Sequence, residues 1–221
     1  MDRKSFAMKW DTFLFDLGGV LVDDFALNYN TSNRIFRMLG KRDITKEEFV
    51  ANLLPIQNLY RLVGLNRQES REGERLFQQF MTQGLDSIVI QPDAKPILET
   101  LKQRGLKLGL VTQYPHGVGN RLLSKTGIST YFDTVVGFED SDEQKPSPKP
   151  ILIALDRLRS KPEASVFVGD MKQDIMAGHS AGVWTVGIDR GEYAYHTRDT
   201  LQEAKPGMII EDLLELTKLL A

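Results

Sequence analysis

The sequence DTFLFDLGGVLVDD, residues 11–24, decides how the rest of the chain folds. Its segment 12–15 is an uninterrupted run of β-branched, aromatic and aliphatic residues, which is typical of a strand buried on both faces in a parallel sheet. Asp16 follows at the carboxyl end of this strand, where open α/β sheets bind ligands. Gly18 and Gly19 come next and can adopt backbone angles that other residues avoid. The stretch predicts a carboxylate at the ligand-binding edge of a sheet, and the ordinary alternative is an Asp that only caps a turn.

The composition is that of an ordinary globular chain, and it argues against several classes of function. The 221 residues are 41% hydrophobic and 26% charged, with a formal net charge of -2 and no long cluster of Lys and Arg, so nothing favours a nucleic-acid partner. The absence of Cys excludes disulfides and thiol chemistry and agrees with a reducing, cytoplasmic location. The sequence contains no run of about 18 apolar residues, so no membrane span is expected. Residues 1–10 lack the apolar core of a signal peptide.

The spacing of apolar residues divides the chain into a core and an insert. Residues 23–91 contain no long β-branched run, and their apolar residues recur at helical spacing. Within them, Thr45-Lys46-Glu47-Glu48 has the pattern of a capping box and predicts the start of a helix. From residue 92 onward helix and strand alternate, which predicts a parallel sheet with right-handed crossovers. We therefore expect an α/β fold, with a doubly wound, Rossmann-like core of residues 1–22 and 92–221 and a helical cap of residues 23–91.

The core elements follow from this alternation. We predict strands at residues 106–112, 134–137, 165–169, 183–188 and 208–210. We predict helices at residues 94–104, 115–125, 148–159, 173–181 and 213–220. In the helix at 148–159 we expect Ile151, Leu152 and Leu155 to face the core.

Polar side chains of kinds that suit one task follow three further strands or loops. Thr112 and Gln113 end one predicted strand, Lys145 lies in a Pro-dense loop, and Asp170 ends another strand with Asp174 at helical spacing behind it. Carboxylates are hard ligands that suit Mg²⁺, while a hydroxyl and an ammonium suit phosphate oxygens. Taken singly, each has an ordinary explanation: a helix start, a strand residue or a solvated loop lysine. Their joint occurrence in this order, around a helical insert, favours a phosphoryl-binding site.

These segments resemble the motifs of the haloacid dehalogenase-like hydrolase superfamily, in the branch with a helical cap after the first motif. Residues 15–21 resemble motif one, residues 110–113 motif two, residues 145–148 motif three, and residues 168–170 with Asp174 motif four. The motif-four region and residues 207–210 look closest to the phosphoglycolate phosphatase group. The resemblance covers nearly the whole chain.

The resemblance implies a role for each motif residue. Asp16 is expected to attack a phosphomonoester and form an aspartyl-phosphate that water then hydrolyses. The substrate is expected to be a small phosphorylated metabolite, such as a sugar phosphate or a phosphoglycolate-like acid. Phosphate binding is expected from Leu17, Thr112, Gln113 and Lys145. Mg²⁺ is expected to bind Asp16, Gly18 through its carbonyl, Asp170 and Asp174.

Gly18 departs from the pattern of the family's phosphatases, which usually have a second Asp there. That Asp protonates the leaving group and later activates water, and such general acid–base help is worth about 100- to 10,000-fold in rate. The chain is therefore expected to be a slow phosphatase, to prefer good leaving groups, or to use another acid. The nearest candidates in the sequence are Asp23, Asp24 and His116. His179 and His196 adjoin no motif.

Other functions stay open at this point. Dehalogenases and phosphonate hydrolases of the superfamily also lack the second Asp, although Asp170 and Asp174 indicate a metal site that dehalogenation does not need. A phosphonate hydrolase needs a cap lysine for a Schiff base, and Lys41 and Lys46 are the only lysines there. A non-catalytic protein that binds phosphate or a partner is the third alternative. The cap is expected to select the leaving group through polar residues such as Asn28, Tyr29, Arg34, Arg61 and Arg67. The sequence does not predict the oligomeric state.

Overall fold

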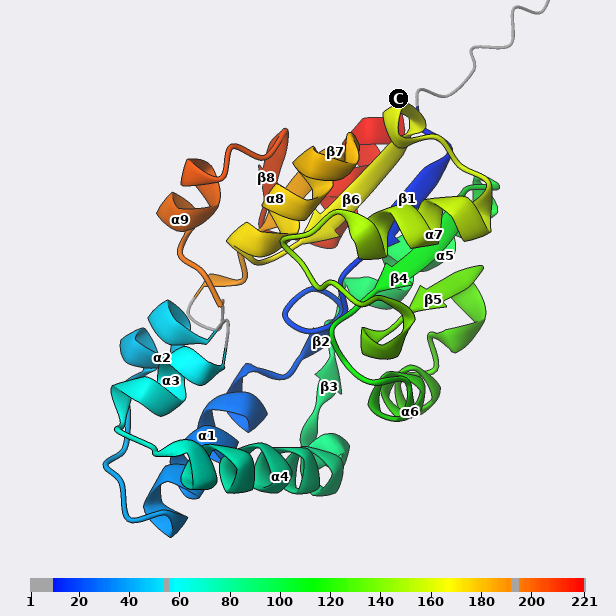
Figure 1. Cartoon of the computed structure of the whole chain (residues 1–221). Helices are drawn as coiled ribbons and strands as arrows, with labels where there is room; N and C mark the ends of the chain where they lie inside the picture. The colour runs from blue at the N-terminus through cyan, green and yellow to red at the C-terminus, as the bar shows by residue number, and fades with distance from the viewer. Residues whose placement is uncertain (1–9, 54–55, 192–194, 221) are drawn as a thin grey trace, which may run out of the picture. The chain divides into compact units, whose positions relative to one another are not determined.

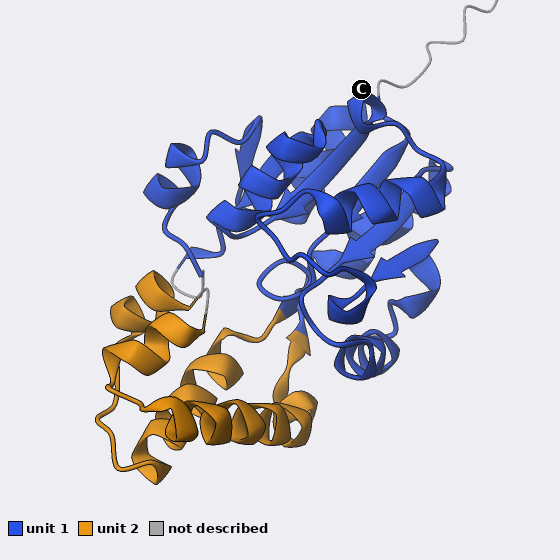
Figure 2. Ribbon diagram, in the orientation of Figure 1, with its two compact units in different colours: residues 1–22, 90–221 blue, residues 23–89 orange. Residues whose placement is uncertain are grey.

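The structure is a computed structural model that describes residues 10–53, 56–191 and 195–220. The chain divides into two compact units, which Figure 2 shows in blue and orange. One unit comprises residues 1–22 and 90–221, and the other comprises residues 23–89. The sequence predicted the two boundaries between these units after residues 22 and 91.

A six-stranded parallel sheet forms the centre of the first unit, with the strand order β5-β4-β1-β6-β7-β8 (Figure 1). The strands are β1 (Thr12–Phe15), β4 (Lys107–Val111), β5 (Thr134–Val136), β6 (Ser165–Gly169), β7 (Trp184–Ile188) and β8 (Met208–Ile210). In the register of this sheet Phe15 lies opposite both Leu110 and Val168. The chain therefore leaves β1, β4 and β6 at neighbouring points of one edge. The predicted α/β fold with a parallel sheet is confirmed.

Helices cover this sheet. The longer helices of the unit are α5 (Ala94–Gln103), α6 (His116–Thr126), α7 (Lys149–Leu158) and α8 (Lys172–Ala181). Two shorter elements follow towards the C-terminus, α9 (Arg198–Glu203) and the 3₁₀ helix η6 (Leu213–Leu220). Helices α7 and α8 pack on each other and on strands β4 to β7, while α5 packs on β4 and on η6. Figure 1 shows α7 and α8 in front of the sheet.

Apolar side chains from both layers form the core of the unit. Leu14 of β1 and Phe167 of β6 pack with the inward faces of α7 and α8, and both are fully buried. Since side chains alternate along a strand, Phe13 and Phe15 point to the opposite face, where they are also fully buried. The prediction for Leu152 is wrong, because the buried side of α7 consists of Ile151, Ala154, Leu155 and Leu158 at helical spacing, and Leu152 lies outside that stripe.

Residues 23–89 form a helical unit. Its helices are α1 (Phe25–Met38), α2 (Lys46–Asn52), α3 (Gln57–Leu62) and α4 (Arg67–Gly84), and a single 3₁₀ turn, η1 (Leu85–Ser87), follows α4. The predicted capping box is confirmed at α2, where the Thr45 side chain accepts from the Glu48 amide and Glu48 accepts from the Thr45 amide. Phe36 and Phe49 are fully buried in this unit. Two further strands, β2 (Val22–Asp23) and β3 (Val89–Ile90), pair with each other.

The C-terminal elements differ from the prediction. Residues 213–220 form a 3₁₀ helix. The sequence did not predict α9, because Leu201 is the only buried residue of this short helix and one residue makes no apolar pattern. Among the described residues, no helix is long and apolar enough to cross a membrane.

Candidate active site

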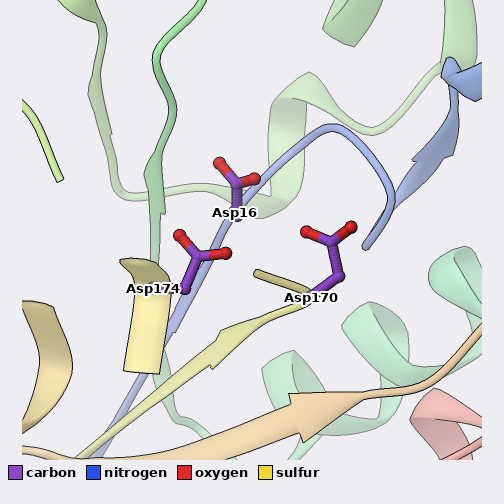
Figure 3. A group of neighbouring side chains, drawn as sticks. All are labelled: Asp16, Asp170 and Asp174. Atoms are coloured by element: carbon purple, nitrogen blue, oxygen red, sulfur yellow. The ribbon is translucent and has the colours of Figure 1, made fainter. Parts of the chain in front are cut away.

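Three carboxylates meet at the carboxyl edge of the central strands. Asp16 follows β1 and Asp170 follows β6, which is the neighbouring strand, while Asp174 lies in the first turn of α8. One oxygen of each carboxylate lies within 4.8 Å of the others (Figure 3). The Met171 amide donates to Asp174 Oδ2 at 3.0 Å, so the start of α8 fixes the Asp174 side chain. The sequence prediction that these residues lie together is therefore met by the geometry.

Two glycines make this close approach possible. A Cβ on Gly169, which ends β6, would overlap the side chain of Asp174. A Cβ on Gly19 would overlap the carboxylate of Asp170, and the φ angle of Gly19 is 69°, in the left-handed region. Glycine is therefore required at both positions for the backbone to lie against the carboxylates.

Lys145 supplies the positive charge of the cluster. Its Nζ lies 2.9 Å from Asp16 Oδ1 and 2.6 Å from Asp174 Oδ1, and it donates to the carbonyl of Val111 at 3.3 Å. Only 3% of the side chain is exposed, so the alternative of a solvated loop lysine is wrong. Burial alone would lower the pKa of Lys145, but the charges of Asp16 and Asp174 outweigh it and raise the pKa above the ordinary value. Lys145 is therefore a buried ammonium that bridges two carboxylates.

The electrostatics of Asp16 differ from those of an exposed aspartate. Burial and the neighbouring charge of Asp174 raise its pKa, Lys145 and the Leu17 amide lower it, and the net result is a pKa of about 6. When all four groups are ionised, the three carboxylates carry -3 and the ammonium carries +1, so the cluster has a formal charge of -2. A clustered set of hard oxygen ligands with excess negative charge fits a divalent cation such as Mg²⁺.

The remaining predicted phosphate ligands lie near the same strand ends. Thr112 follows β4 and is buried, and its Oγ1 accepts from the Tyr114 amide at 3.2 Å. Gln113 is half-buried. The Leu17 side chain is fully buried, and the Leu17 backbone amide donates to the Asp16 carboxylate.

Two of the three candidate replacement acids, His116 and Asp24, contact residues that are not part of the carboxylate cluster. His116 Nε2 lies 2.7 Å from Asp140 Oδ2. Asp24 is buried and accepts from Asn28 Nδ2 at 3.1 Å. His179 Nε2 lies 3.1 Å from the Thr185 hydroxyl. The structure shows Asp23 half-buried in β2 and gives it no part in the cluster.

His196 lies nearer to the cluster than its place in the sequence indicates. Burial lowers its pKa, and it lies within electrostatic reach of Asp174 and Lys172. This proximity follows from the sheet topology, because β7 is the neighbour of β6 and the segment after β7 therefore lies beside the end of β6. The distance of His196 from the motifs along the sequence does not show it.

Three of the five polar residues expected to contact substrate from the insert have partners within it. Asn28 donates to Asp24, the Tyr29 hydroxyl donates to the Ile44 carbonyl at 2.9 Å, and the Arg34 guanidinium lies 3.8 Å from the centre of the Phe80 ring. Arg61 and Arg67 are exposed.

Comparison with known proteins identifies the family to which this arrangement belongs. Residues 13–188 match the haloacid dehalogenase-like hydrolase family, and this range includes the strand ends that carry Asp16, Thr112 and Asp170. The chain belongs to this hydrolase family. It is 31% identical over 209 residues to pyrophosphatase PpaX of Bacillus velezensis, covering 92% of this chain and 94% of that one. It is 29% identical over 218 residues to phosphoglycolate phosphatase of Pasteurella multocida, covering 93% and 96% of the two chains.

A solved structure supports the same assignment of this hydrolase. The crystal structure of a predicted phosphoglycolate phosphatase from Haemophilus somnus has a TM-score of 0.86 and 25% sequence identity. The match covers 96% of this chain and 98% of that chain. The predicted resemblance to the superfamily is confirmed.

Proposed function

We propose that the protein is a Mg²⁺-dependent phosphatase that hydrolyses small phosphorylated metabolites. The observation that supports this best is the buried cluster in which Lys145 bridges Asp16 and Asp174 beside Asp170. Phosphoryl transfer needs an aligned nucleophile and positive charge around the phosphoryl oxygens. Phosphatase names among the relatives agree with the proposal.

Asp16 is the nucleophile in this proposal. Its carboxylate attacks phosphorus, the bond from phosphorus to the leaving oxygen breaks, and an aspartyl-phosphate forms. Water then attacks phosphorus and releases phosphate and the free carboxylate. The lysine ammonium at 2.9 Å from Asp16 holds one phosphoryl oxygen close to the nucleophile, and Thr112, Gln113 and the Leu17 amide bind the others.

Asp16, Asp170, Asp174 and the Gly18 carbonyl would hold Mg²⁺. The bound ion would neutralise charge on the phosphoryl group. The cap unit, residues 23–89, is assigned the selection of the leaving group, a role that lids have in many enzymes.

Gly18 restricts the substrates that this site can hydrolyse rapidly. It has no side chain that could protonate a leaving oxygen, so the reaction favours leaving groups that depart without a proton. Inorganic pyrophosphate releases phosphate, a much better leaving group than the alkoxide released from phosphoglycolate. We therefore place pyrophosphate and activated esters ahead of phosphoglycolate.

The test is phosphate release from p-nitrophenyl phosphate, pyrophosphate and phosphoglycolate, with Mg²⁺ and with EDTA. We expect Asp16→Asn to lose at least about a thousandfold in rate, because the nucleophile is gone. Asp199→Asn makes the same change at an exposed aspartate and should keep wild-type activity. If no ester or anhydride releases phosphate while inorganic phosphate still binds, a non-catalytic binding protein is the better description.

A gain-of-function variant tests the leaving-group argument separately. Gly18→Asp restores an acid at that position, and the left-handed φ angle of the turn lies at Gly19 and is not disturbed. We expect the variant to accelerate phosphoglycolate hydrolysis by about 100-fold or more and p-nitrophenyl phosphate hydrolysis far less. Equal acceleration of both substrates would contradict the assignment of acid catalysis to this position.

A further inference from the structure

A buried arginine outside the four motifs forms hydrogen bonds to the loop that follows the nucleophile. Arg190 lies two residues beyond the end of β7. Its Nη2 donates to the Val20 carbonyl at 2.6 Å, and its Nε donates to the Gly19 carbonyl at 3.4 Å. The same guanidinium donates to both oxygens of Asp93, at 2.7 and 3.1 Å. One side chain therefore joins the β7 end, the loop after Asp16 and the residue before α5.

The network is buried and is continued by a further segment. The side chains of Arg190 and Asp93 are 10% and 7% exposed. The Leu213 amide, at the start of η6, donates to Asp93 Oδ2 at 2.8 Å. A buried ion pair usually adds little net stability compared with apolar residues of the same size, because both ions lose their hydration. Its value here is geometric, since the planar guanidinium directs its donors to two carbonyls and both carboxylate oxygens in one fixed arrangement, whereas a lysine ammonium is a rotatable point charge with three donors.

The loop that Arg190 contacts, residues 17–22, contains the backbone groups next to the nucleophile. It closes on itself through donation from the Gly19 amide to the Val22 carbonyl and from the Leu21 and Val22 amides to the Leu17 carbonyl. Gly19 also lies against the carboxylate of Asp170. Because β6 lies between β1 and β7 in the sheet, Arg190 reaches past the end of the strand that bears Asp170. Rotation or lifting of this loop would move the Leu17 amide, which donates to Asp16, and with it the Gly18 carbonyl that the proposed Mg²⁺ site uses.

We propose that Arg190, held by Asp93, is a positioning residue for catalysis. It fixes loop 17–22 so that the Leu17 amide and the Gly18 carbonyl keep their places beside Asp16. The inference rests on the proposed function for its catalytic consequence, whereas the loop contacts themselves do not depend on it. Arg190 touches no reacting atom in this scheme.

The first test measures the loop directly. Hydrogen–deuterium exchange is followed by mass spectrometry on peptides covering residues 17–22 and 134–140 of the full chain. Arg190→Lys keeps the charge but loses the fork, and we expect exchange at 17–22 to rise by about tenfold or more, with no change at 134–140. Arg157→Lys is the matched control, because Arg157 also joins a carbonyl and a carboxylate, those of Val135 and Asp140. It should affect residues 134–140 and leave 17–22 unchanged.

A second variant covers the case in which Arg190→Lys folds poorly. Asp93→Asn preserves the shape of the partner and removes the charge that fixes the guanidinium. We expect the same local rise in exchange at 17–22. Wild-type exchange at 17–22 in both variants, or an equal rise across the whole unit, would overturn the proposal.

The second test separates positioning from a purely structural tie. Mn²⁺ binding is measured by electron paramagnetic resonance of the free ion, and kcat and KM are measured with p-nitrophenyl phosphate. We expect Arg190→Lys to weaken Mn²⁺ binding and to lower kcat by about tenfold or more with KM near the wild-type value, since misplacement of about 1 Å can cost 100-fold. Arg157→Lys should match the wild type in both. A loosened loop with wild-type kcat and Mn²⁺ affinity would overturn the catalytic role.

Failure of the proposed function gives a different result. A wild-type chain that releases no phosphate contradicts the phosphatase proposal, while exchange at residues 17–22 and Mn²⁺ binding in the variants still decide whether Arg190 positions the loop.

Discussion

One ion pair from each unit shows how different the surroundings of paired charges are in this molecule. In the helical unit, Arg75 and Glu72 form a pair at 2.6 Å on the surface of α4, with side chains 61% and 43% exposed. In the sheet unit, Lys145 and Asp174 also lie 2.6 Å apart, but each side chain is only 3% exposed. The distances are equal, and the surroundings differ completely.

This difference separates solvated charges from charges that serve a site. Water screens an exposed pair, and the chain neither gains nor loses much from it. Buried ions lose their hydration, so a cluster of three carboxylates with a single ammonium destabilises the fold. Buried, perturbed charges at the ligand-binding edge of a sheet therefore indicate a functional site, whereas a count of ion pairs does not.

Replacement of Lys145 gives the largest expected effect. In Lys145→Met, Asp16 and Asp174 face each other without the bridging ammonium, and loss of one partner of a buried pair costs about 3–5 kcal/mol. We expect a loss of that size in the free energy of unfolding, measured by urea titration in EDTA, and a loss of phosphate release of at least about a thousandfold.

The control is Lys102→Met, which breaks the more exposed pair of Lys102 with Asp133 at 2.8 Å. It should cost less than about 1 kcal/mol and leave phosphate release unchanged. Equal losses in the two variants would show that the buried cluster has no special role.

The raised pKa of Asp16 predicts a specific dependence of stability on pH. Its pKa is about 6 in the folded chain, against 3.8 for an unperturbed aspartate such as that of the unfolded chain, so between these values the folded state binds more protons than the unfolded state. The resulting stabilisation is complete below about pH 4 and is lost as the pH rises through 6, a change on the order of 3 kcal/mol. Asp16→Asn should remove this fall, measured by urea unfolding from pH 4 to 7 in EDTA, and Mg²⁺ should reduce it in the wild type.

Asp133 provides a control of opposite sign. Burial would raise its pKa, but Lys102 and the Leu108 amide outweigh this and lower it below the ordinary value. Asp133→Asn should therefore remove stability that is present above the ordinary pKa and lost towards acid. A wild-type profile that does not fall between pH 4 and 6 would contradict the assigned state of Asp16.

The strand ends of the site could be predicted from the sequence because their signals are local. The apolar runs before Asp16, Thr112 and Asp170 specify buried parallel strands, and the topology of such sheets then brings the residues that follow to one edge. The capping box at Thr45 is local in the same sense. These predictions needed no knowledge of how loops fold.

Other features depend on loops that meet only in three dimensions. The bridge from Lys145 to two carboxylates, the contact of Gly19 with Asp170, and the Arg190–Asp93 network join segments far apart in the sequence. No periodicity encodes them. Leu152 shows the same limit within a helix, since hydrophobicity alone did not distinguish the buried stripe of α7 from its neighbour.

The smallest expected effect tests the exposed side of the comparison on a single helix. Arg75→Ala removes the surface pair of α4, and we expect the urea midpoint followed by far-UV circular dichroism to stay at the wild-type value, because water replaces the lost contact. Asn66→Ala on the same helix removes the cap that accepts from the Gln68 and Glu69 amides at 2.9 and 3.0 Å, and should cost about 1 kcal/mol. The two residues are similarly exposed, so the difference isolates a satisfied backbone donor from a solvated charge. A loss in Arg75→Ala as large as that in Asn66→Ala would mean that exposed pairs stabilise this unit, and the contrast with the buried cluster would then lose its basis.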